Sequence, residues 1–422
     1  MITLCRALQE KNHDLFFTSL SQITDPGMLN QHVFEWTALG LACKHLLVME
    51  VGHLLKAGAN PNIATKYFNK FPIHLACDHE RGNLEMVQNL VNHGSEINVQ
   101  DADLSTPLHL ACFQSNDEVA FYLLEKGARI DLSDLDDETP LVRACYAHNK
   151  TIISRLIKAG SNVNYPNGEC LEILIRAGSH MMDSVHELLR ANADLSLQPY
   201  MSVASAYNNV EMMKLLREQN FPIDQAGRAL GLTPLHHACV SIPSGIAPVK
   251  LLLHWGANVN TQTQTGDTPL HYAVERMNLK KVQVLLSFHP DVNIMNSVGL
   301  SPLGILLHAR CAAEDIDSYL TIARLLIEVG SCLSLSEVTE IKKTMPVILS
   351  QQLIEAQISN LLDEIQTELV NARTLRELCR IVIRKTVKPN VDDNITFLPI
   401  PQILLDYLRF NDILSSEDSS ES

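Results

Sequence analysis

A segment of about 33 residues recurs along the chain, and this repetition limits the fold more than any other feature. The best copies are STPLHLACFQSNDEVAFYLLEKGARIDLSD from Ser105, LTPLHHACVSIPSGIAPVKLLLHWGANVNTQT from Leu232 and DTPLHYAVERMNLKKVQVLLSFHPDVNIMN from Asp267. Weaker copies begin at WTALGLAC, FPIHLAC, ETPLVRAC and LSPLGILL. The apolar residue after the proline position marks the register at Leu39, Ile73, Leu108, Leu141, Leu174, Met201, Leu235, Leu270 and Leu303. Because these marks are 34, 35, 33, 33, 27, 34, 35 and 33 residues apart, the chain is predicted to contain nine stacked repeats.

Each repeat carries the signals of a short helix pair. Thr106, Thr233 and Thr268 can cap a helix with their hydroxyls, and a proline follows in the first turn, where a missing N–H is harmless. Where the second helix ends, a left-handed backbone suits glycine, and the sequence has Gly58, Gly94, Gly127, Gly160, Gly256 and Gly330. Asn192 and Asn220 take this place in two poorer copies. One repeat cannot bury its own apolar face, so we expect neighbours to stack into a continuous core.

The period and the T-P-L-H-x-A pattern resemble the ankyrin repeat. The resemblance covers residues 32–334 as about nine repeats and implies an all-α solenoid, with residues 1–31 as an N-terminal cap or partial repeat. Residues 168–225 depart from the pattern, because LEILIRAGSHMMDSVHELLRANADL and PYMSVASAYNNVEMMKLLREQN lack TPLH. The 27-residue step in this region predicts one loop finger that is shorter by about six residues.

The recurrent H-x-x-C spacing, as in His74 and Cys77, could suggest zinc ligands. However, one repeat position holds five cysteines, namely Cys43, Cys77, Cys112, Cys145 and Cys239. This position is predicted to lie inside the helix pair, where cysteine behaves as a small apolar residue. Because the copies lie in separate repeats, four ligands cannot converge on one tetrahedral point. We therefore expect packing for the cysteines, hydrogen bonds between neighbouring repeats for the TPLH histidines, and no metal or cofactor.

Composition argues against several other classes of function. The chain of 422 residues has a formal charge of −15 and no broad basic stripe, so a nucleic-acid partner is not expected. Glu10, Lys11 and Asp14 interrupt the N-terminal segment where a signal peptide needs apolar residues, and no run of about 18 uncharged apolar residues occurs. We therefore expect no membrane segment and a cytoplasmic or nuclear location. GxxxxGK[ST], GxSxG and HExxH are absent, so no enzyme site is predicted.

The repeats are followed by two segments with helical periodicity. Residues 335–372 are predicted to cap or link the stack by covering its terminal apolar face. The stretch TLRELCRIVIRKTV then places Leu375, Cys379 and Ile383 at i, i+4 and i+8 on one helix face, with Leu378 beside them. A small cysteine between larger apolar residues would let another surface approach closely. On its own, this pattern could equally be one more capping helix.

Fifteen residues after Ile383 comes the segment Leu398-Pro399-Ile400-Pro401, followed by the short apolar stretch ILLDYL. L-x-x-x-C-x-x-x-I and L-P-I-P in this order resemble a SOCS box over residues 373–412. With nine ankyrin repeats ahead of it, the chain is similar to the ankyrin repeat and SOCS box family. The resemblance implies a C-terminal three-helix SOCS box after the solenoid. The acidic, serine-rich residues 413–422 are expected to form a disordered tail.

The same resemblance implies the partners of this region. Elongin C, with elongin B, would be bound by Leu375, Leu378, Cys379 and Ile383. Cullin-5 and its RING-finger partner would be selected by Leu398, Pro399, Ile400 and Pro401. Two prolines suit this task because they hold a segment extended before it binds, which reduces the entropic cost of ordering it.

Two loop fingers are candidates for binding a protein substrate. Tips such as QDADLS and TQTQTGD are expected to be polar, whereas IATKYFNKF has Tyr67 and Phe68 between lysines. Exposed aromatic residues are frequent interface anchors, but both rings could instead pack on a neighbouring finger or on the N-terminal cap. The acidic finger SDLDDE, with Asp136 and Asp137, would favour a basic partner or would be an ordinary solvated loop.

The sequence thus predicts a non-enzymatic substrate-recognition subunit of an elongin B/C–cullin-5 RING ubiquitin ligase. Its substrate would be a protein that the sequence does not name. The alternative is an ankyrin scaffold or inhibitor whose C-terminal helices only cap the stack. A stoichiometric complex with elongin B and elongin C would distinguish the two.

Overall fold

A computed structural model describes residues 1–79, 83–227, 230–241, 245–308, 316–331 and 363. Apart from an isolated bridge between Val33 and Trp36, the regular secondary structure of these residues is helical, which confirms the predicted all-α class. The chain divides into two compact units. The first is Met1–Asp291 with Asn296–Val298, and the second is Val292–Met295 with the residues from Gly299 on.

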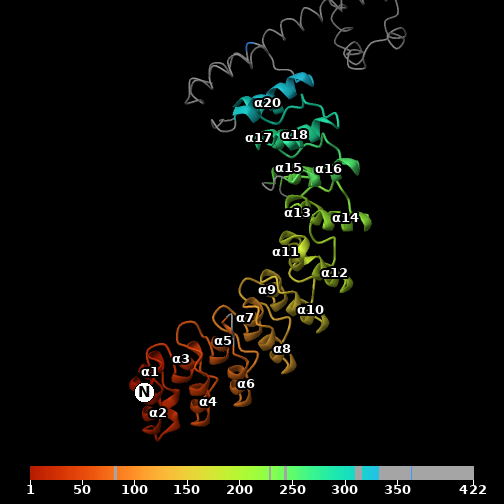
Figure 1. Cartoon of the computed structure of the whole chain (residues 1–422). Helices are drawn as coiled ribbons and strands as arrows, with labels where there is room; N and C mark the ends of the chain where they lie inside the picture. The colour runs from red at the N-terminus through yellow and green to blue at the C-terminus, as the bar shows by residue number, and fades with distance from the viewer. Residues whose placement is uncertain (80–82, 228–229, 242–244, 309–315, 332–362, 364–422) are drawn as a thin grey trace, which may run out of the picture. The chain divides into compact units, whose positions relative to one another are not determined.

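Helix pairs build the first unit. Its first helices are α3 (Ala38–Lys44), α5 (Pro72–Cys77), α7 (Pro107–Phe113), α9 (Pro140–Tyr146), α11 (Glu169–Ala177), α13 (Tyr200–Ala206), α15 (Pro234–Val240) and α17 (Pro269–Glu275). Its second helices are α4 (Val48–Lys56), α6 (Leu84–Asn92), α8 (Asp117–Glu125), α10 (Lys150–Lys158), α12 (Met182–Arg190), α14 (Val210–Glu218), α16 (Ala247–His254) and α18 (Leu279–Leu286). First helices pack on first helices from α3 to α17, and Figure 1 shows the second helices as a parallel row.

A further helix pair precedes these repeats. Helices α1 (Ile2–Gln9) and α2 (His13–Ser21) pack on each other, and α1 also contacts α3. The short 3-10 helix η1 (Pro26–Asn30) leads from this pair to the first finger. The segment predicted as a cap or partial repeat therefore contains a helix pair of its own.

The helices start and stop where the residue types favour it. Thr37 and Thr106 accept hydrogen bonds from the N–H groups of Gly40 and His109, which lie three residues further on. The six glycines predicted to be left-handed after the second helices all have positive φ, from 86° at Gly127 to 106° at Gly330. Asn192 and Asn220 have φ of 62° and 58°, so they replace glycine as predicted.

The repeat-position cysteines are buried in the core, as predicted. Burial raises the pKa of the Cys239 thiol to about 12, and it also raises the pKa of Cys43, Cys77, Cys112 and Cys145. They keep their protons at neutral pH and pack as small apolar side chains. The successive copies lie in successive first helices.

The TPLH histidines join neighbouring repeats, which confirms the prediction. His109 Nδ1 accepts a hydrogen bond from the Thr106 N–H at 3.1 Å, so the ring proton is assigned to Nε2. Nε2 then donates to the carbonyl oxygen of Glu138, 3.1 Å away in the next finger. His74 and His236 make the same bonds to the carbonyl oxygens of Ser105 and Asp267. Each histidine thereby fixes a helix start against the following repeat.

The middle of the stack differs from the prediction of one finger shortened by about six residues. Helix α11 begins at Glu169, so Leu174 lies one turn beyond the expected register position. The shortening is shared by two connections, residues 159–168 and 191–199, whereas residues 126–139 form a full-length finger. No proline marks the start of α11. Instead, Gly168 has φ of 76° and packs against the buried ring of Tyr200, whose hydroxyl donates to the Gly168 carbonyl oxygen at 3.2 Å.

The second unit contains one further helix pair among its described residues. Helices α19 (Pro302–His308) and α20 (Ile316–Glu328) pack on each other, and Leu303, Leu306, Ile322 and Leu326 are buried. Asn293 donates through its side chain to the carbonyl oxygen of Gly330 at 3.2 Å. The predicted capping helices of residues 335–372, the SOCS box and the tail lie outside the described residues, except for Asp363.

Candidate functional site

The described part of the chain contains only one of the two predicted binding regions. Residues 373–412, with the expected elongin- and cullin-binding side chains, lie outside it. The expected substrate-binding residues lie on loop fingers of the first unit, close to the first helices. The candidate site is therefore a surface made by these fingers and helices.

The finger with two aromatic residues is a tight turn that presents both rings to solvent. The Thr65 N–H donates to the Lys70 carbonyl oxygen at 2.9 Å, which closes the turn over residues 65–70. Tyr67 is 76% exposed and Phe68 is 60% exposed. This exposure favours the interpretation of both residues as interface anchors over the alternative in which they pack on a neighbouring finger or on the N-terminal helix pair.

The acidic finger is organised around one arginine. Asp134 is almost fully buried and accepts hydrogen bonds from both Arg143 Nε, at 3.0 Å, and Arg143 Nη2, at 2.6 Å. Its other carboxylate oxygen accepts the N–H groups of Asp136 and Glu138. Asp136 and Asp137 remain exposed, and the Asp137 carboxylate accepts a hydrogen bond from the Tyr165 hydroxyl. The finger is thus neither a simple solvated loop nor a set of four free carboxylates.

Neighbouring fingertips are joined by backbone hydrogen bonds. The Lys66 N–H donates to the Glu35 carbonyl oxygen at 3.3 Å. The Ala102 N–H donates to the Phe68 carbonyl oxygen at 3.0 Å. The next bond joins the Leu135 N–H to the Asp103 carbonyl oxygen at 2.9 Å. These bonds hold the first four fingertips side by side.

Large apolar side chains are exposed on each of these four fingertips. Besides Tyr67 and Phe68, they are Phe34, Leu104 and Leu135, with exposed fractions of 88%, 45% and 63%. The expectation that QDADLS forms a polar tip is wrong at Leu104, because the turn directs this side chain away from the core. We call Phe34, Tyr67, Phe68, Leu104 and Leu135 the fingertip ridge. The sequence signal for Leu104 was its place in the turn, where later repeats have Gly231 and Gly266.

A cavity of about 230 Å³ lies beside the ridge, between the fingers and helices α7 and α9. Four carboxylates line it, from Asp78, Asp101, Asp103 and Asp136. Two cations also line it, but the Lys70 Nζ is 2.8 Å from an Asp78 oxygen and Arg143 is held by Asp134 and Glu138. Because the four carboxylates outnumber the two cations, this cavity favours a positively charged guest.

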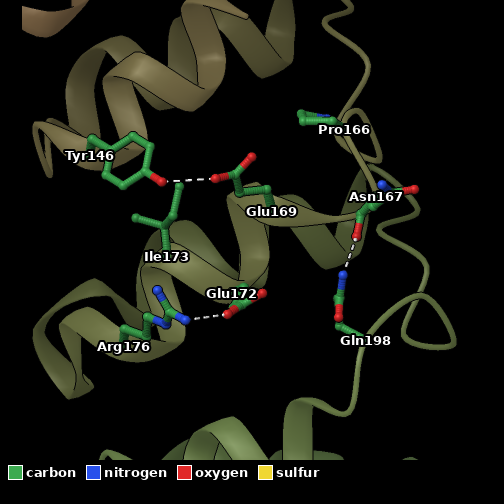
Figure 2. Close-up of a pocket in the computed structure, with 8 residues that line it drawn as sticks. All are labelled: Tyr146, Pro166, Asn167, Glu169, Glu172, Ile173, Arg176 and Gln198. Atoms are coloured by element: carbon green, nitrogen blue, oxygen red, sulfur yellow. Dashed lines mark hydrogen bonds and ion pairs between the residues drawn. The ribbon is translucent and has the colours of Figure 1, made fainter. Parts of the chain in front are cut away.

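A second cavity of about 270 Å³ follows in the shortened region of the stack. Figure 2 shows Tyr146, Glu169 and Ile173 on one side of it, with Glu172 and Arg176 below them. The Tyr146 hydroxyl donates to Glu169 at 2.8 Å, and this bond raises the pKa of Tyr146 to about 12. Arg176 pairs with Glu172 at 2.7 Å, so the polar side chains of this cavity are largely satisfied by one another.

Exposed aromatic residues recur at the ends of the first helices. Phe113 and Tyr146 both follow the buried cysteine of their repeat, and Tyr207 follows α13. The guanidinium carbons of Arg143 and Arg176 lie 5.8 Å and 5.7 Å from the ring centres of Phe113 and Tyr207. Aromatic residues and arginine are enriched at interface hot spots. These residues are not among those predicted from the sequence, although the repeat register identifies their position.

Two other kinds of site do not occur within the described ranges. Over residues 1–331, leaving out the four gaps, no group of three or more His, Cys, Asp or Glu side chains could hold a metal ion. No helix in the same residues has the length and hydropathy needed to cross a lipid bilayer.

Comparison with known families matches both parts of the chain. Overlapping matches to the family described as Ankyrin repeats (3 copies) extend over residues 4–101, 46–134, 74–167, 108–199, 167–263 and 243–335. The family described as SOCS box matches residues 371–409.

Individual relatives agree with these families. Ankyrin repeat and SOCS box protein 16 of Homo sapiens is 24% identical over 373 residues, which is 84% of this chain and 70% of that protein. Ankyrin repeat and SOCS box protein 14 of Mus musculus is 25% identical over 268 residues, or 60% of this chain and 44% of that protein. A putative ankyrin repeat protein of fowlpox virus is 29% identical over 175 residues. This match covers 38% of this chain and only 50% of the viral protein.

Proposed function

Because the chain belongs to the ankyrin repeat and SOCS box family, we propose that it is the substrate-recognition subunit of an elongin B/C–cullin-5 RING ubiquitin ligase. The ankyrin repeats would bind the substrate protein, and the SOCS box would bind the ligase. The subunit itself would perform no chemistry. It would instead raise the effective concentration of substrate lysines near a ubiquitin-conjugating enzyme.

The observation that carries this proposal is the SOCS box match over residues 371–409, downstream of ankyrin repeats over residues 4–335. The SOCS box match alone is short, but its combination with ankyrin repeats in one chain agrees with two relatives that are named for both modules. Elongin C would contact the apolar face formed by Leu375, Leu378, Cys379 and Ile383. Cullin-5 would be chosen by the segment Leu398, Pro399, Ile400 and Pro401.

The substrate would be bound by the fingers rather than by the SOCS box. Tyr67 and Phe68 are candidates because their rings are exposed, and Asp136 and Asp137 because their carboxylates lie on an exposed turn. Asp137 is the weaker candidate of the two, since its carboxylate already accepts a hydrogen bond from Tyr165.

The test is co-expression of the full chain with elongin B and elongin C, followed by size-exclusion chromatography. A stoichiometric complex is expected. Leu375→Ala and Cys379→Phe should each abolish it, because truncating or blocking an interface anchor costs about 2 kcal/mol or more. The circular dichroism and melting of the ankyrin repeats should not change, since both residues lie outside the repeats.

Leu361→Ala provides a comparison within the segment expected to cap the repeats, and elongin binding should survive it. If the wild-type chain remained a monomer with elongin B and elongin C present, the ligase proposal would be wrong. The chain would then fit the alternative of an ankyrin scaffold whose C-terminal helices only cap the stack.

A further inference from the structure

We propose that the fingertip ridge and the cavity beside it bind one extended protein segment that combines apolar side chains with at least one arginine or lysine. The ridge would receive the apolar side chains, and the cavity would receive the cation. That this segment belongs to a ubiquitination substrate rests on the proposed function. The chemistry of the segment rests only on the surface itself.

The ridge has the properties of an interface rather than of scattered surface residues. Single exposed apolar side chains are ordinary, but contiguous groups mark binding sites. Here five such side chains come from four consecutive fingers, and the hydrogen bonds at Lys66, Ala102 and Leu135 hold those fingers together. A surface that crosses four repeats is too long for one side chain and suits an extended segment.

The backbone of Leu104 gives a second, independent reason. Its φ of 57° lies in the left-handed region, which a branched apolar residue rarely adopts. The corresponding turn positions of four other repeats have Asn69, Asp137, Gly231 and Gly266, with φ of 50°, 64°, 69° and 78°, which are residue types that tolerate this region. Leucine thus occupies a place where glycine would be less strained, although its side chain contributes little to the core. Backbone strain of this kind is typical of functional sites.

Charge complementarity defines the rest of the partner. Together, the cavity and the acidic finger contain seven carboxylates, from Asp78, Asp101, Asp103, Asp134, Asp136, Asp137 and Glu138. They face two cations, Lys70 and Arg143, both of which already form ion pairs. An arginine of the bound segment could also stack on Phe113, which lines the same cavity and is half exposed. The excess negative charge disfavours phosphates and acidic peptides.

The test uses three pools of fluorescent twelve-residue peptides and fluorescence anisotropy with the full chain. Pool one combines Phe and Leu with Arg and Lys. Pool two keeps Phe and Leu but has Asp and Glu, and pool three keeps Arg and Lys but has Ser for the apolar residues. Pool one should bind at least tenfold more tightly than the other two, and this preference should weaken as salt rises. Equal binding of the three pools, or a preference for pool two, would overturn the proposal.

Variants then locate the binding. Leu104→Gly should weaken pool-one binding about tenfold while the melting temperature stays the same or rises, because the substitution removes a side chain and relieves strain. A purely structural leucine would give the opposite result, with lower melting and unchanged binding. Asp136→Asn should also weaken binding and reduce its salt dependence. The matched control is Leu230→Ser, which removes an exposed apolar side chain from a later finger and should leave binding unchanged.

The double substitution Tyr67→Ser with Phe68→Ser should also weaken the binding of pool one about tenfold. The melting temperature of the protein should not change. None of these measurements needs the ligase. If pool one binds but elongin does not, the proposed function fails and the surface remains a protein-binding site. If elongin binds but the pools are not distinguished, the ligase proposal stands and this assignment of the substrate surface is wrong.

Discussion

The Nζ of Lys281 donates a hydrogen bond to the carbonyl oxygen of Ser241 at 2.7 Å, linking the second helix of one repeat to the end of a first helix in the preceding repeat. Lys281 is fully buried, and its Nζ also contacts the Ser241 hydroxyl at 3.2 Å and the Cys239 carbonyl oxygen at 3.4 Å. Burial lowers the pKa of this amine. The last carbonyls of a helix attract a cation, so Lys281 satisfies the end of α15.

We expect Lys281→Met to destabilise the stack by about 2 kcal/mol, because it leaves the carbonyl oxygens of Cys239 and Ser241 without this donor. Urea unfolding followed by circular dichroism would measure the change. Lys280→Met is the matched control, since Lys280 is exposed on the same helix and should change stability little. Equal effects of the two substitutions would show that the buried amine adds nothing to stability.

Because the histidines that join neighbouring repeats are buried, the protein is expected to lose stability in acid. Burial lowers the pKa of His74 and His236 to about 4, from an ordinary value of 6.5. Between these values the unfolded chain binds protons that the folded chain excludes, so stability falls as pH falls from about 6.5 to about 4. The loss should be on the order of 3 kcal/mol for each histidine.

The double variant His74→Gln with His236→Gln isolates this effect from the titration of carboxylates. It should be less stable than the wild type at pH 7, because two hydrogen bonds between repeats are lost. Its stability should change much less between pH 6.5 and pH 4. Parallel pH profiles for the two proteins, measured by urea unfolding, would contradict the assignment of neutral buried rings.

Much of the stack could be predicted from the sequence because its signals are local. The helix starts depend on threonine and proline at fixed places, and the left-handed ends on glycine or asparagine, as at Gly127 and Asn192. The start of α11 could not be predicted in this way. It depends on the buried Tyr200 and its bond to Gly168, which lie 32 residues apart and have no short-range signature.

The candidate site was predicted only in part, for a related reason. Tyr67 and Phe68 stand out as aromatic residues among polar ones, and both are exposed. The role of Arg143 was missed because its partners Asp134 and Glu138 lie on a different element, and only the fold brings the three charges together. Residue type in sequence shows which side chains could bind a partner, but not which of them are already satisfied within the chain.

Substitution of Arg143 is predicted to reduce the stability of the protein markedly. Arg143→Met leaves the almost fully buried Asp134 carboxylate without its guanidinium, which should cost about 3 kcal/mol. Adding Asp134→Asn should recover most of the loss, because the amide oxygen can still accept the N–H groups of Asp136 and Glu138. The control is Arg155→Met, whose half-exposed guanidinium lies 4.0 Å from Glu125 and should cost less than about 0.5 kcal/mol. Urea unfolding of the wild type and these three variants would check the prediction.

The final prediction separates the two expected ligase partners. Replacing Leu398-Pro399-Ile400-Pro401 with four alanines should leave the elongin B/C complex intact, because the expected elongin-binding residues end at Ile383. Cullin-5 binding to that complex should weaken by roughly thirtyfold or more, since anchor side chains are removed and the alanine segment must be ordered on binding. Calorimetry with cullin-5 and cullin-2 would measure this, and the wild type should prefer cullin-5. Deletion of residues 413–422 is the control and should change neither interaction. If the four alanines abolished elongin binding as well, the prolines would hold the SOCS box together rather than select the cullin.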